Sequence, residues 1–508
     1  MKLKKILGSV SKKNGNIVIN GISFNSTKIK KGNVFFSIRG KKTSGKKFIQ
    51  DVAAKKASCV ITDENIYKKN YKIPIIKVRN CRKSLSEASS NIYNLKPKNI
   101  IAVTGTNGKS SIANFFFQIL TLNKKLSASI GTLGINTRDF KKKNKLTSSD
   151  PITLHKNLFQ LAKKKINHVI LEASSHGLDQ SRLDHVKFNS AIFTNLSHDH
   201  LDYHKSYKNY FNSKLILFKN LLKKKSNIIT DMDIAQYKIL NSIAKEKKYK
   251  IFTIGSKKSY LQLIKHSYKN DKQEFQIKYK NKIYKLFVNL IGKIQIKNIL
   301  MAMIAAEKSN LKFDKITKII NKIKSVNGRL EKIGNLRNGS IVILDFAHTP
   351  EALKNCLENL QDQFVNRKIS IVFGCGGDRD KLKRFQMGKI ANMFCNKIYL
   401  TDDNPRFESP KKIRTSIKKY IYKKKLFEIS NREKAISNAI KNLNSGEILL
   451  VAGKGHEENQ DYGNYKRKFS DKKIILKYIK SKNKILSKNW KVNIINEEFK
   501  NKISLNSK

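Results

Sequence analysis

A short glycine-containing stretch carries the residues best suited to chemistry. Residues 104–111 read TGTNGKSS and follow an apolar run, NIIAV, that predicts a buried strand. The usual P-loop has a glycine, four residues and then Gly-Lys-Ser/Thr, whereas only two residues separate Gly105 from Gly108 here. Backbone N–H groups at the start of a helix bind phosphate oxygens, while Lys109 supplies a positive charge and Ser110 an oxygen for Mg²⁺. The stretch therefore predicts a shortened phosphate-binding loop, with an ordinary turn carrying a surface lysine as the alternative.

Carboxylates and histidines follow the next two predicted strands. Glu172 ends the apolar run HVILE, at the carboxyl edge where α/β sheets gather ligands. The segment 194–204, TNLSHDHLDYH, adds a cluster of acidic and histidine side chains: His198, Asp199, His200, Asp202 and His204. Such a cluster could bind zinc, but the chain has no C-x-x-C pair, and an ATP site needs oxygen ligands for Mg²⁺. We expect Glu172 and one histidine near the metal, with the others capping helices or supporting the ligands.

The elements that position these residues follow from the periodicity of the sequence. After Lys109, apolar residues recur at the spacing of one helix face, namely Ile112, Phe115, Phe116, Ile119 and Leu120. Strand-like runs then alternate with helical stretches, as in HVILEAS, SAIFTNL and NIITD. This alternation predicts a doubly wound parallel sheet.

Breaks along the chain divide it into three α/β domains and a tail. We expect a small N-terminal α/β domain over residues 1–97, ending at the linker NLKPKN. A central doubly wound ATPase domain of P-loop type follows over 98–330. After SVNGRLEKIG, further strand and helix alternation predicts a Rossmann-like domain over 331–490, and residues 491–508 form a tail rich in Lys and Asn.

The composition is strongly basic. The chain has 106 Lys and Arg against 37 Asp and Glu, a formal net charge of +69. Nucleic-acid binding would explain this charge, but the lysines occur throughout the chain without a basic stripe, which favours compositional drift. Five cysteines without a paired motif indicate a reducing compartment. Because no signal peptide is recognisable and no apolar run reaches the ~18 residues of a membrane span, we expect a cytoplasmic protein.

Eight motifs together resemble the Mur ligase family of peptidoglycan precursor synthesis. They occur in the order TGTNGKSS, EASSHGLDQSRLD, TNLSHDHLDYH, NGRLE, DFAHTPEAL, FGCGGDRDKLKR, DNPR and AGKGHE. The resemblance extends from about residue 25 to residue 475, and the shortened loop is that family's own form of the P-loop. It implies an ATP-dependent ligase that adds meso-2,6-diaminopimelate to UDP-N-acetylmuramoyl-L-alanyl-D-glutamate through an acyl phosphate.

The resemblance also assigns the ATP and metal residues. It implies a catalytic group of Lys109, Glu172, His200 and Lys214, with Mg²⁺ held by Ser110, Glu172, His200 and a carbamate on Lys214. The implied ATP-binding residues are Gly105, Thr106, Asn107, Gly108, Lys109, Ser110, Ser111, Asn298, Arg329, Asp345 and His348. Without the neighbouring motifs, Lys214 would be one helix-surface lysine among many. His198 departs from the family, in which relatives often carry arginine.

Two further sets of residues match the family's substrate contacts. The resemblance places the UDP-precursor on Ser26, Thr147, Ser148, Ser174, Gln180 and Arg182. Both neighbours of Ser26 differ from the family's uridine motif. Diaminopimelate is implied to contact Arg379, Asp403, Asn404, Pro405, Arg406, Gly453 and Glu457. Diaminopimelate has one carboxylate more than lysine, and a guanidinium reads a carboxylate through paired hydrogen bonds, so Arg406 is the expected specificity residue.

Three alternatives remain open from the sequence. An L-lysine-adding relative would lack the arginine at position 406 but share most other motifs. Sister ligases, such as the D-alanyl-D-alanine-adding enzyme and folylpolyglutamate synthetases, share GTNGKS but not DNPR with GKGHE. A basic P-loop ATPase acting on nucleic acid would explain the charge but not EASSHGLDQ. We expect a monomer whose partners are its three substrates, without nucleic acid or membrane.

Overall fold

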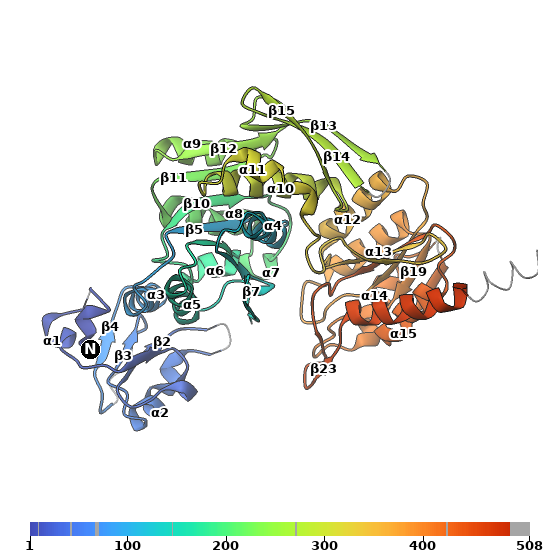
Figure 1. Ribbon diagram of the computed structural model, residues 1–508. Coiled ribbons are helices and arrows are strands. Elements are labelled where there is room, and N and C mark those ends of the chain that lie inside the picture. The colour runs from blue at the N-terminus through green and yellow to red at the C-terminus, as the bar shows by residue number, and fades with distance from the viewer. Residues whose placement is uncertain are drawn as a thin grey trace, which may run out of the picture.

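A computed structural model describes residues 1–8, 10–40, 43–66, 71–144, 146–269, 272–422 and 425–487. Three bodies are visible in Figure 1, each built around its own sheet. This arrangement confirms the predicted three-domain α/β fold. The predicted tail over 491–508 lies outside the described residues.

The N-terminal body is a small parallel sheet in the order β1-β2-β3-β4. Its core is divided between the two faces of the sheet, with Phe36 on one side and Phe35 on the other. These alternate because successive side chains of a strand point to opposite faces. The elements are β1 Gly21–Ser23, β2 Asn33–Ser37, β3 Cys59–Thr62, β4 Ile75–Lys77, α1 Lys12–Gly15, α2 Ile49–Ala54 and α3 Cys81–Ile92.

The central body is a large mixed sheet in the order β15-β14-β13-β12-β11-β10-β5-β9-β6-β7-β8. Its middle strands are parallel, from β12 through β6. The strands are β5 Asn99–Thr104, β6 Ser127–Gly131, β7 Gly134–Thr137, β8 Lys141–Lys142, β9 His168–Glu172, β10 Phe188–Phe193, β11 Leu222–Asp231, β12 Lys250–Gly255, β13 Leu261–Lys269, β14 Lys272–Tyr279 and β15 Lys282–Val288. The helices are α4 Lys109–Leu122, α5 Pro151–Lys163, α6 Ser175–Asp179, α7 Leu201–His204, α8 Tyr207–Ile216, α9 Tyr237–Glu246, α10 Lys293–Glu307 and α11 Phe313–Thr317.

Both edges of this sheet depart from the predicted parallel arrangement, and at one of them β7 pairs antiparallel with β6 and with β8. β13, β14 and β15 pair antiparallel with one another and project beyond the helices at the top of Figure 1. Along β14, buried and more exposed residues alternate. This alternation is typical of antiparallel strands with one covered face, whereas β5 and β10 are buried on both faces.

The C-terminal body is a six-stranded sheet within the described residues, in the order β16-β17-β21-β18-β19-β20. All neighbours pair parallel except β16 with β17. The elements are β16 Glu331–Asn335, β17 Ile341–Asp345, β18 Ile369–Phe373, β19 Lys397–Leu400, β20 Lys425–Glu428, β21 Ile448–Ala452, α12 Pro350–Gln363, α13 Leu382–Phe394, α14 Pro410–Lys418 and α15 Arg432–Lys441, with a hairpin of β22 Asn459–Asp461 and β23 Lys466–Lys468.

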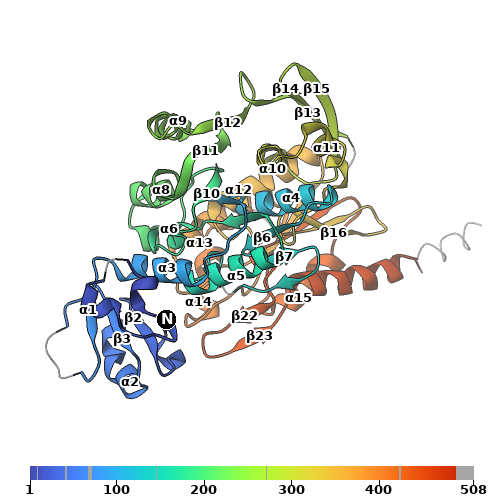
Figure 2. The ribbon, with the colours of Figure 1, turned by 60° about the vertical axis from the view of Figure 1, so that its left-hand side comes forward.

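Polar contacts join the central and C-terminal bodies at one end of α10. Gly292, the residue before α10, donates its N–H to Gln363 Oε1 on α12 at 2.8 Å. Ile294 donates its N–H to Asn359 Oδ1 on the same helix at 3.2 Å. Figure 2 shows α12 running close to α10 from a second direction. The helix that carries Asn298 is therefore held at its start by the neighbouring domain.

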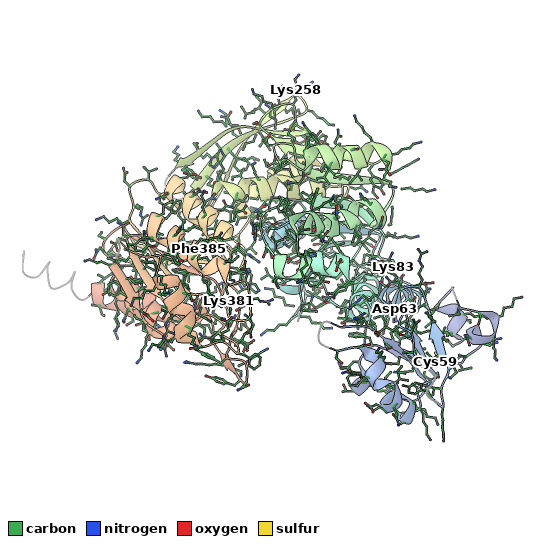
Figure 3. The ribbon with its side chains drawn as sticks, turned by 180° about the vertical axis from the view of Figure 1, so that it is seen from behind. Cys59, Asp63, Lys83, Lys258, Lys381 and Phe385 are labelled. Atoms are coloured by element: carbon green, nitrogen blue, oxygen red, sulfur yellow. The ribbon has the colours of Figure 1, made fainter. Side chains whose placement is uncertain are left out.

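The positive charge is spread over the whole molecule. Figure 3 labels exposed Lys83, Lys258 and Lys381, which lie on the N-terminal, central and C-terminal bodies. No helix in the described ranges is both long and apolar enough to span a bilayer.

Candidate functional site

The phosphate loop lies between β5 and α4, as the sequence predicts. Gly105 and Gly108 have φ of +142° and +89°, a region that L-residues with a side chain rarely adopt. α4 begins at Lys109, and its predicted apolar face, which includes Ile112, Phe115 and Phe116, is buried. The free N–H groups at the start of α4 therefore point toward the loop, where they can bind an anion.

Neighbouring segments support this loop closely. A Cβ on Gly105 would lie 1.8 Å from Thr194 Oγ1, and one on Gly108 would lie 2.6 Å from Asn298 Oδ1. Asn107 donates its backbone N–H to Asn195 Oδ1 at 2.9 Å. Asn195 was not singled out from the sequence, and its position directly after β10 was the available signal. The two glycines are thus required by close approach as well as by backbone conformation.

A carboxylate and a hydroxyl meet beside the loop. Ser110 Oγ donates to Glu172 Oε2 at 2.9 Å. Thr132 donates to the same carboxylate twice, from its N–H to Oε1 at 2.9 Å and from its Oγ1 to Oε2 at 3.0 Å. Glu172 is buried, and its oxygens with Ser110 Oγ form the hard donor set that Mg²⁺ prefers. These residues fit the metal that the sequence predicts here.

Two lysines converge on one carbonyl oxygen of the loop. Lys109 Nζ donates to Gly105 O at 2.8 Å, and Lys214 Nζ on α8 donates to the same oxygen at 2.9 Å. Lys214 is buried, with its ammonium 4.3 Å from the centre of the Tyr210 ring. Burial, followed by the charge of Lys109, lowers the pKa of Lys214 well below its usual range. Lys214 is therefore not a surface lysine, and burial favours its neutral form more than it would for an exposed lysine.

His200 immediately precedes α7, and its side chain lies near the charges of Lys109 and Lys214. Its Nε2 is 3.4 Å from Asp199 Oδ2, and its N–H bonds Asp199 Oδ1 at 2.8 Å. Partial burial lowers the pKa of His200 to about 4, although Asp199 opposes this. Across the described residues, no three His, Cys, Asp or Glu side chains come together as a metal cluster. Among the described residues, the predicted magnesium ligands Glu172 and His200 therefore do not belong to such a cluster.

The other predicted ATP residues lie on both sides of the domain boundary. Arg329 Nη2 is 3.5 Å from Ser110 Oγ, and its guanidinium packs 4.7 Å from the centre of the Phe346 ring. Asp345 ends β17 and accepts the N–H groups of Leu330 and Ala347 at 2.6 and 2.7 Å. Burial lowers the pKa of Arg329 and raises that of Asp345. Arg329, two residues before β16, brings the segment that leads into the C-terminal body directly to Ser110 of the phosphate loop.

Most of the predicted precursor residues form one network beneath Glu172. Ser148 Oγ donates to Glu172 O at 2.9 Å and receives a bond from Ser174 Oγ at 3.0 Å. Arg182 Nη1 donates to Ser148 O at 2.9 Å and Nη2 to Gln180 Oε1 at 2.6 Å. Thr147 joins the network through Thr132, with 3.0 Å between their hydroxyls. Ser26 lies apart from it in the N-terminal body, where its carbonyl accepts a bond from Lys55.

A cavity of about 210 Å³ lies between the central and C-terminal bodies. One wall comes from residues 198–202, and the other from segments that follow β17, β18, β19 and β21. Carboxyl ends of parallel strands meet at one edge of a sheet, which explains why these segments converge. Eight predicted site residues line it, namely His200, His348, Arg379, Asp403, Asn404, Arg406, Gly453 and Glu457.

The loop DNPR contributes Asp403, Asn404 and Arg406 to the lining of this cavity and is closely packed against neighbouring segments. Arg406 Nη1 donates to Gly377 O at 2.7 Å, and Arg406 has a φ of +52°. A Cβ on Gly453 would lie 2.6 Å from Asp403 Oδ2, and one on Gly377 would lie 1.9 Å from Pro405 O. The loop is therefore positioned by glycines on two neighbouring segments, which presents Arg406 to the cavity.

Comparison with known proteins agrees with this architecture. Three family descriptions match successive segments: "Mur ligase family, catalytic domain" over 18–93, "Mur ligase middle domain" over 103–306 and "Mur ligase, glutamate ligase domain" over 328–455. The UDP-N-acetylmuramoyl-L-alanyl-D-glutamate–2,6-diaminopimelate ligase of Rickettsia typhi is 40% identical over 91% of this chain and 94% of its own. The ligase of the same name from Chelativorans sp. is 36% identical over 92% and 96%.

Solved structures also match this chain over most of its length. A structure of a UDP-N-acetylmuramoyl-L-alanyl-D-glutamate–2,6-diaminopimelate ligase matches with a TM-score of 0.69 and 28% identity, over 95% of this chain and 99% of that one. The MurF ligase from Thermotoga maritima in complex with ADP matches with a TM-score of 0.61 and 16% identity, over 92% and 99%. At that identity the second match concerns the fold alone.

Proposed function

The chain belongs to the Mur ligase family, and we propose that it joins meso-2,6-diaminopimelate to UDP-N-acetylmuramoyl-L-alanyl-D-glutamate at the expense of ATP. The observation that carries this proposal is the cavity between residues 198–202 of the central domain and the DNPR loop, with Arg406 on its wall. The relatives that are 36–40% identical bear the name of this reaction. In this assignment the N-terminal domain binds the UDP-precursor, the central domain binds ATP and the C-terminal domain binds the amino acid.

The proposed chemistry proceeds in two steps. The γ-carboxylate of the precursor attacks the γ-phosphorus of ATP, forming an acyl phosphate and releasing ADP. The amine of diaminopimelate then attacks the acyl carbon, the amide bond forms, and inorganic phosphate leaves. The amine must lose its proton for the second step. Catalysis of this kind depends mainly on positioning and on neutralising phosphate charge.

The chain's own residues supply that positioning. We assign Lys109 and the N–H groups at the start of α4 to the β- and γ-phosphates, with Arg329 adding a second positive charge. Asn298 and Asp345 are assigned to the nucleoside. Mg²⁺ held by Ser110, Glu172, His200 and a Lys214 carbamate would neutralise the transferring phosphoryl group. The depressed pKa of Lys214 supports the carbamate, since only a neutral amine reacts with CO₂.

Selection of the amino acid is assigned to the far end of the cavity. The extra carboxylate of diaminopimelate would meet Arg406, and Arg379 is a second arginine on the cavity wall. L-Lysine would bring an ammonium to the same place, where a guanidinium repels it and leaves it without a partner. We also propose that the enzyme acts as a cytoplasmic monomer, without nucleic acid or membrane partners.

Phosphate release tests the proposal directly. The protein is supplied with ATP, Mg²⁺ and UDP-N-acetylmuramoyl-L-alanyl-D-glutamate, and either meso-diaminopimelate or L-lysine is added. We expect release with diaminopimelate alone. Equal release with lysine would retain a ligase but contradict the role of DNPR, and release stimulated by nucleic acid would contradict the ligase assignment itself.

A further inference from the structure

One lysine of the C-terminal domain is completely buried beside the cavity without lining it. Lys454 follows β21, and its side chain has no solvent exposure. Its ammonium donates to Asn404 Oδ1 at 2.9 Å and to Glu457 Oε2 at 2.8 Å. Both partners line the cavity, whereas Lys454 does not. Any influence of Lys454 on a ligand therefore passes through these two side chains.

The three side chains form a closed ring of hydrogen bonds. Asn404 Nδ2 donates to Glu457 Oε2 at 3.0 Å, which completes the ring. Asn404 Oδ1 also accepts the N–H of Asp461 at 2.9 Å. With two donors on its oxygen and a carboxylate at its nitrogen, the Asn404 amide can adopt only one orientation. The ring thereby fixes the orientation in which the Asn404 amide is presented to the cavity.

The ring also determines how Glu457 is presented. Both of its hydrogen bonds end on Oε2, so they leave Oε1 as the acceptor for a ligand in the cavity. The Glu457 side chain is 34% exposed, so a ligand in the cavity can reach its carboxylate. The charge of Lys454 balances that of Glu457 inside the domain, and a charge-assisted bond orients a carboxylate more strongly than a neutral one.

We propose that Lys454 is a positioning residue for the amino-acid substrate. It orients the Asn404 amide and the Glu457 carboxylate so that they can bind the ammonium and carboxylate groups of that substrate. This inference rests on the proposed function. A buried ammonium is costly unless it is paired, and here its pairing is made entirely with two residues of the cavity wall. Lys454 influences amino-acid binding and has no part in forming the acyl phosphate.

A second lysine of the same domain provides a matched control. Lys397 Nζ bonds Glu447 Oε2 at 3.0 Å, and this pair is also largely buried. Neither residue lines the cavity. Lys397→Met therefore removes a buried lysine–carboxylate bond without touching the wall, and we expect it to change stability but not the KM for diaminopimelate.

The test compares Lys454→Met with Lys397→Met in the full chain. Phosphate release gives the KM for meso-diaminopimelate and for ATP. In parallel, hydroxylamine replaces the amino acid and traps the acyl phosphate as a hydroxamate, which reports the first step alone. For Lys454→Met we expect a KM for diaminopimelate raised on the order of 10- to 100-fold, with the KM for ATP and the rate of hydroxamate formation within about twofold of wild type.

Lys454→Gln guards against a folding defect, because its amide keeps one donor for Glu457. We expect a smaller rise in KM for this variant, again with hydroxamate formation retained. An unchanged KM in Lys454→Met would overturn the inference. Loss of hydroxamate formation in both Lys454 variants would overturn it too, since the lysine would then serve the whole fold. If the wild-type protein forms hydroxamate but makes no product with diaminopimelate, the proposed function fails instead.

Discussion

Replacing Lys214 by methionine should make the protein more stable and nearly inactive. Methionine is unbranched and close to lysine in length, so it can occupy the same space without a charge. Two ammonium groups share the Gly105 carbonyl in the wild-type protein, with nitrogen–oxygen distances of 2.8 and 2.9 Å. The substitution removes one of these two positive charges from a buried position.

The size of the stabilisation follows from that geometry. Since both nitrogens bond one oxygen, they lie no more than about 6 Å apart, which gives a repulsion of about 3 kcal/mol at an effective dielectric constant of about 20. The lost bond to Gly105 O offsets part of this, because such a bond contributes about 1–2 kcal/mol. We therefore expect Lys214→Met to raise the free energy of unfolding by about 1–2 kcal/mol near neutral pH.

The pH dependence of this gain has a definite sign. Burial and Lys109 lower the pKa of Lys214 in the folded protein from its model-compound value of 10.5. Between the folded pKa and 10.5 the unfolded chain binds the extra proton, so wild-type stability rises with pH in that interval. The advantage of Lys214→Met is thus largest below the folded pKa and disappears as the pH approaches 10.5.

Urea unfolding at several pH values measures the effect, in buffers purged of CO₂. Lys219→Met is the matched control, since Lys219 is an exposed lysine just after α8. We expect the control to change stability by less than about 0.5 kcal/mol and to keep its activity. A Lys214→Met variant that is less stable than wild type at neutral pH, or whose difference does not shrink at high pH, would refute the electrostatic reasoning.

Activity tests the carbamate independently. We expect Lys214→Met to lose at least about 100-fold in kcat, because it cannot form the carboxylate-like ligand for Mg²⁺. Wild-type activity should rise on addition of bicarbonate, and carbon-13 NMR with labelled bicarbonate should detect a carbamate that is missing from the variant. If bicarbonate leaves the wild-type activity unchanged and no carbamate signal is detected, this role of Lys214 is excluded.

Three further substitutions probe separate parts of the site. Arg406→Ala should lower kcat/KM for meso-diaminopimelate by about 10- to 100-fold while leaving L-lysine little changed; an equal loss for both amino acids, measured by phosphate release, would contradict its selective role. Gly131→Ala would place a Cβ 2.1 Å from Glu172 Oε1, so it should raise the Mg²⁺ concentration needed for half-maximal activity. Gly8→Ala is its control, because the nearest atom to that Cβ would be 3.6 Å away, and it should leave this concentration unchanged. Asn298→Ala should raise the KM for ATP about 10-fold without altering the KM for diaminopimelate, and a change in both would indicate that it supports the loop instead.

Local signals allowed much of the fold and the site region to be predicted. Gly105, Gly108 and Lys109 lie between an apolar strand and an amphipathic helix, and the structure has both elements there. Glu172 ends β9, where the general rule for parallel sheets placed it, whereas DNPR, which follows β19 of another sheet, was found through the family resemblance. The catalytic and binding roles of these residues stay predictions until they are measured.

Long-range contacts explain what the sequence could not indicate. Thr132 and Asn195 support Glu172 and the phosphate loop from the segments that follow two other strands, and that position was the sole local signal for them. Lys454 stands inside a recognised motif, but its burial against Asn404 depends on how β19 and β21 are ordered in the sheet. The antiparallel strands β13 to β15 were missed because the prediction of a parallel sheet rested on runs between residues 99 and 231 and assigned no element to residues 261–288.

The contacts between α12 and the start of α10 bear on how the molecule opens in the native state. Local opening of the C-terminal domain would remove Gln363 and Asn359 from Gly292 and Ile294, and the first turn of α10 would lose its external partners. Because α10 carries Asn298 against Gly108, fraying would spread from that turn to the phosphate loop. Amide hydrogens of α10 and of the start of α4 should then exchange with solvent together with those of α12, as one cooperative unit that crosses the boundary between two domains.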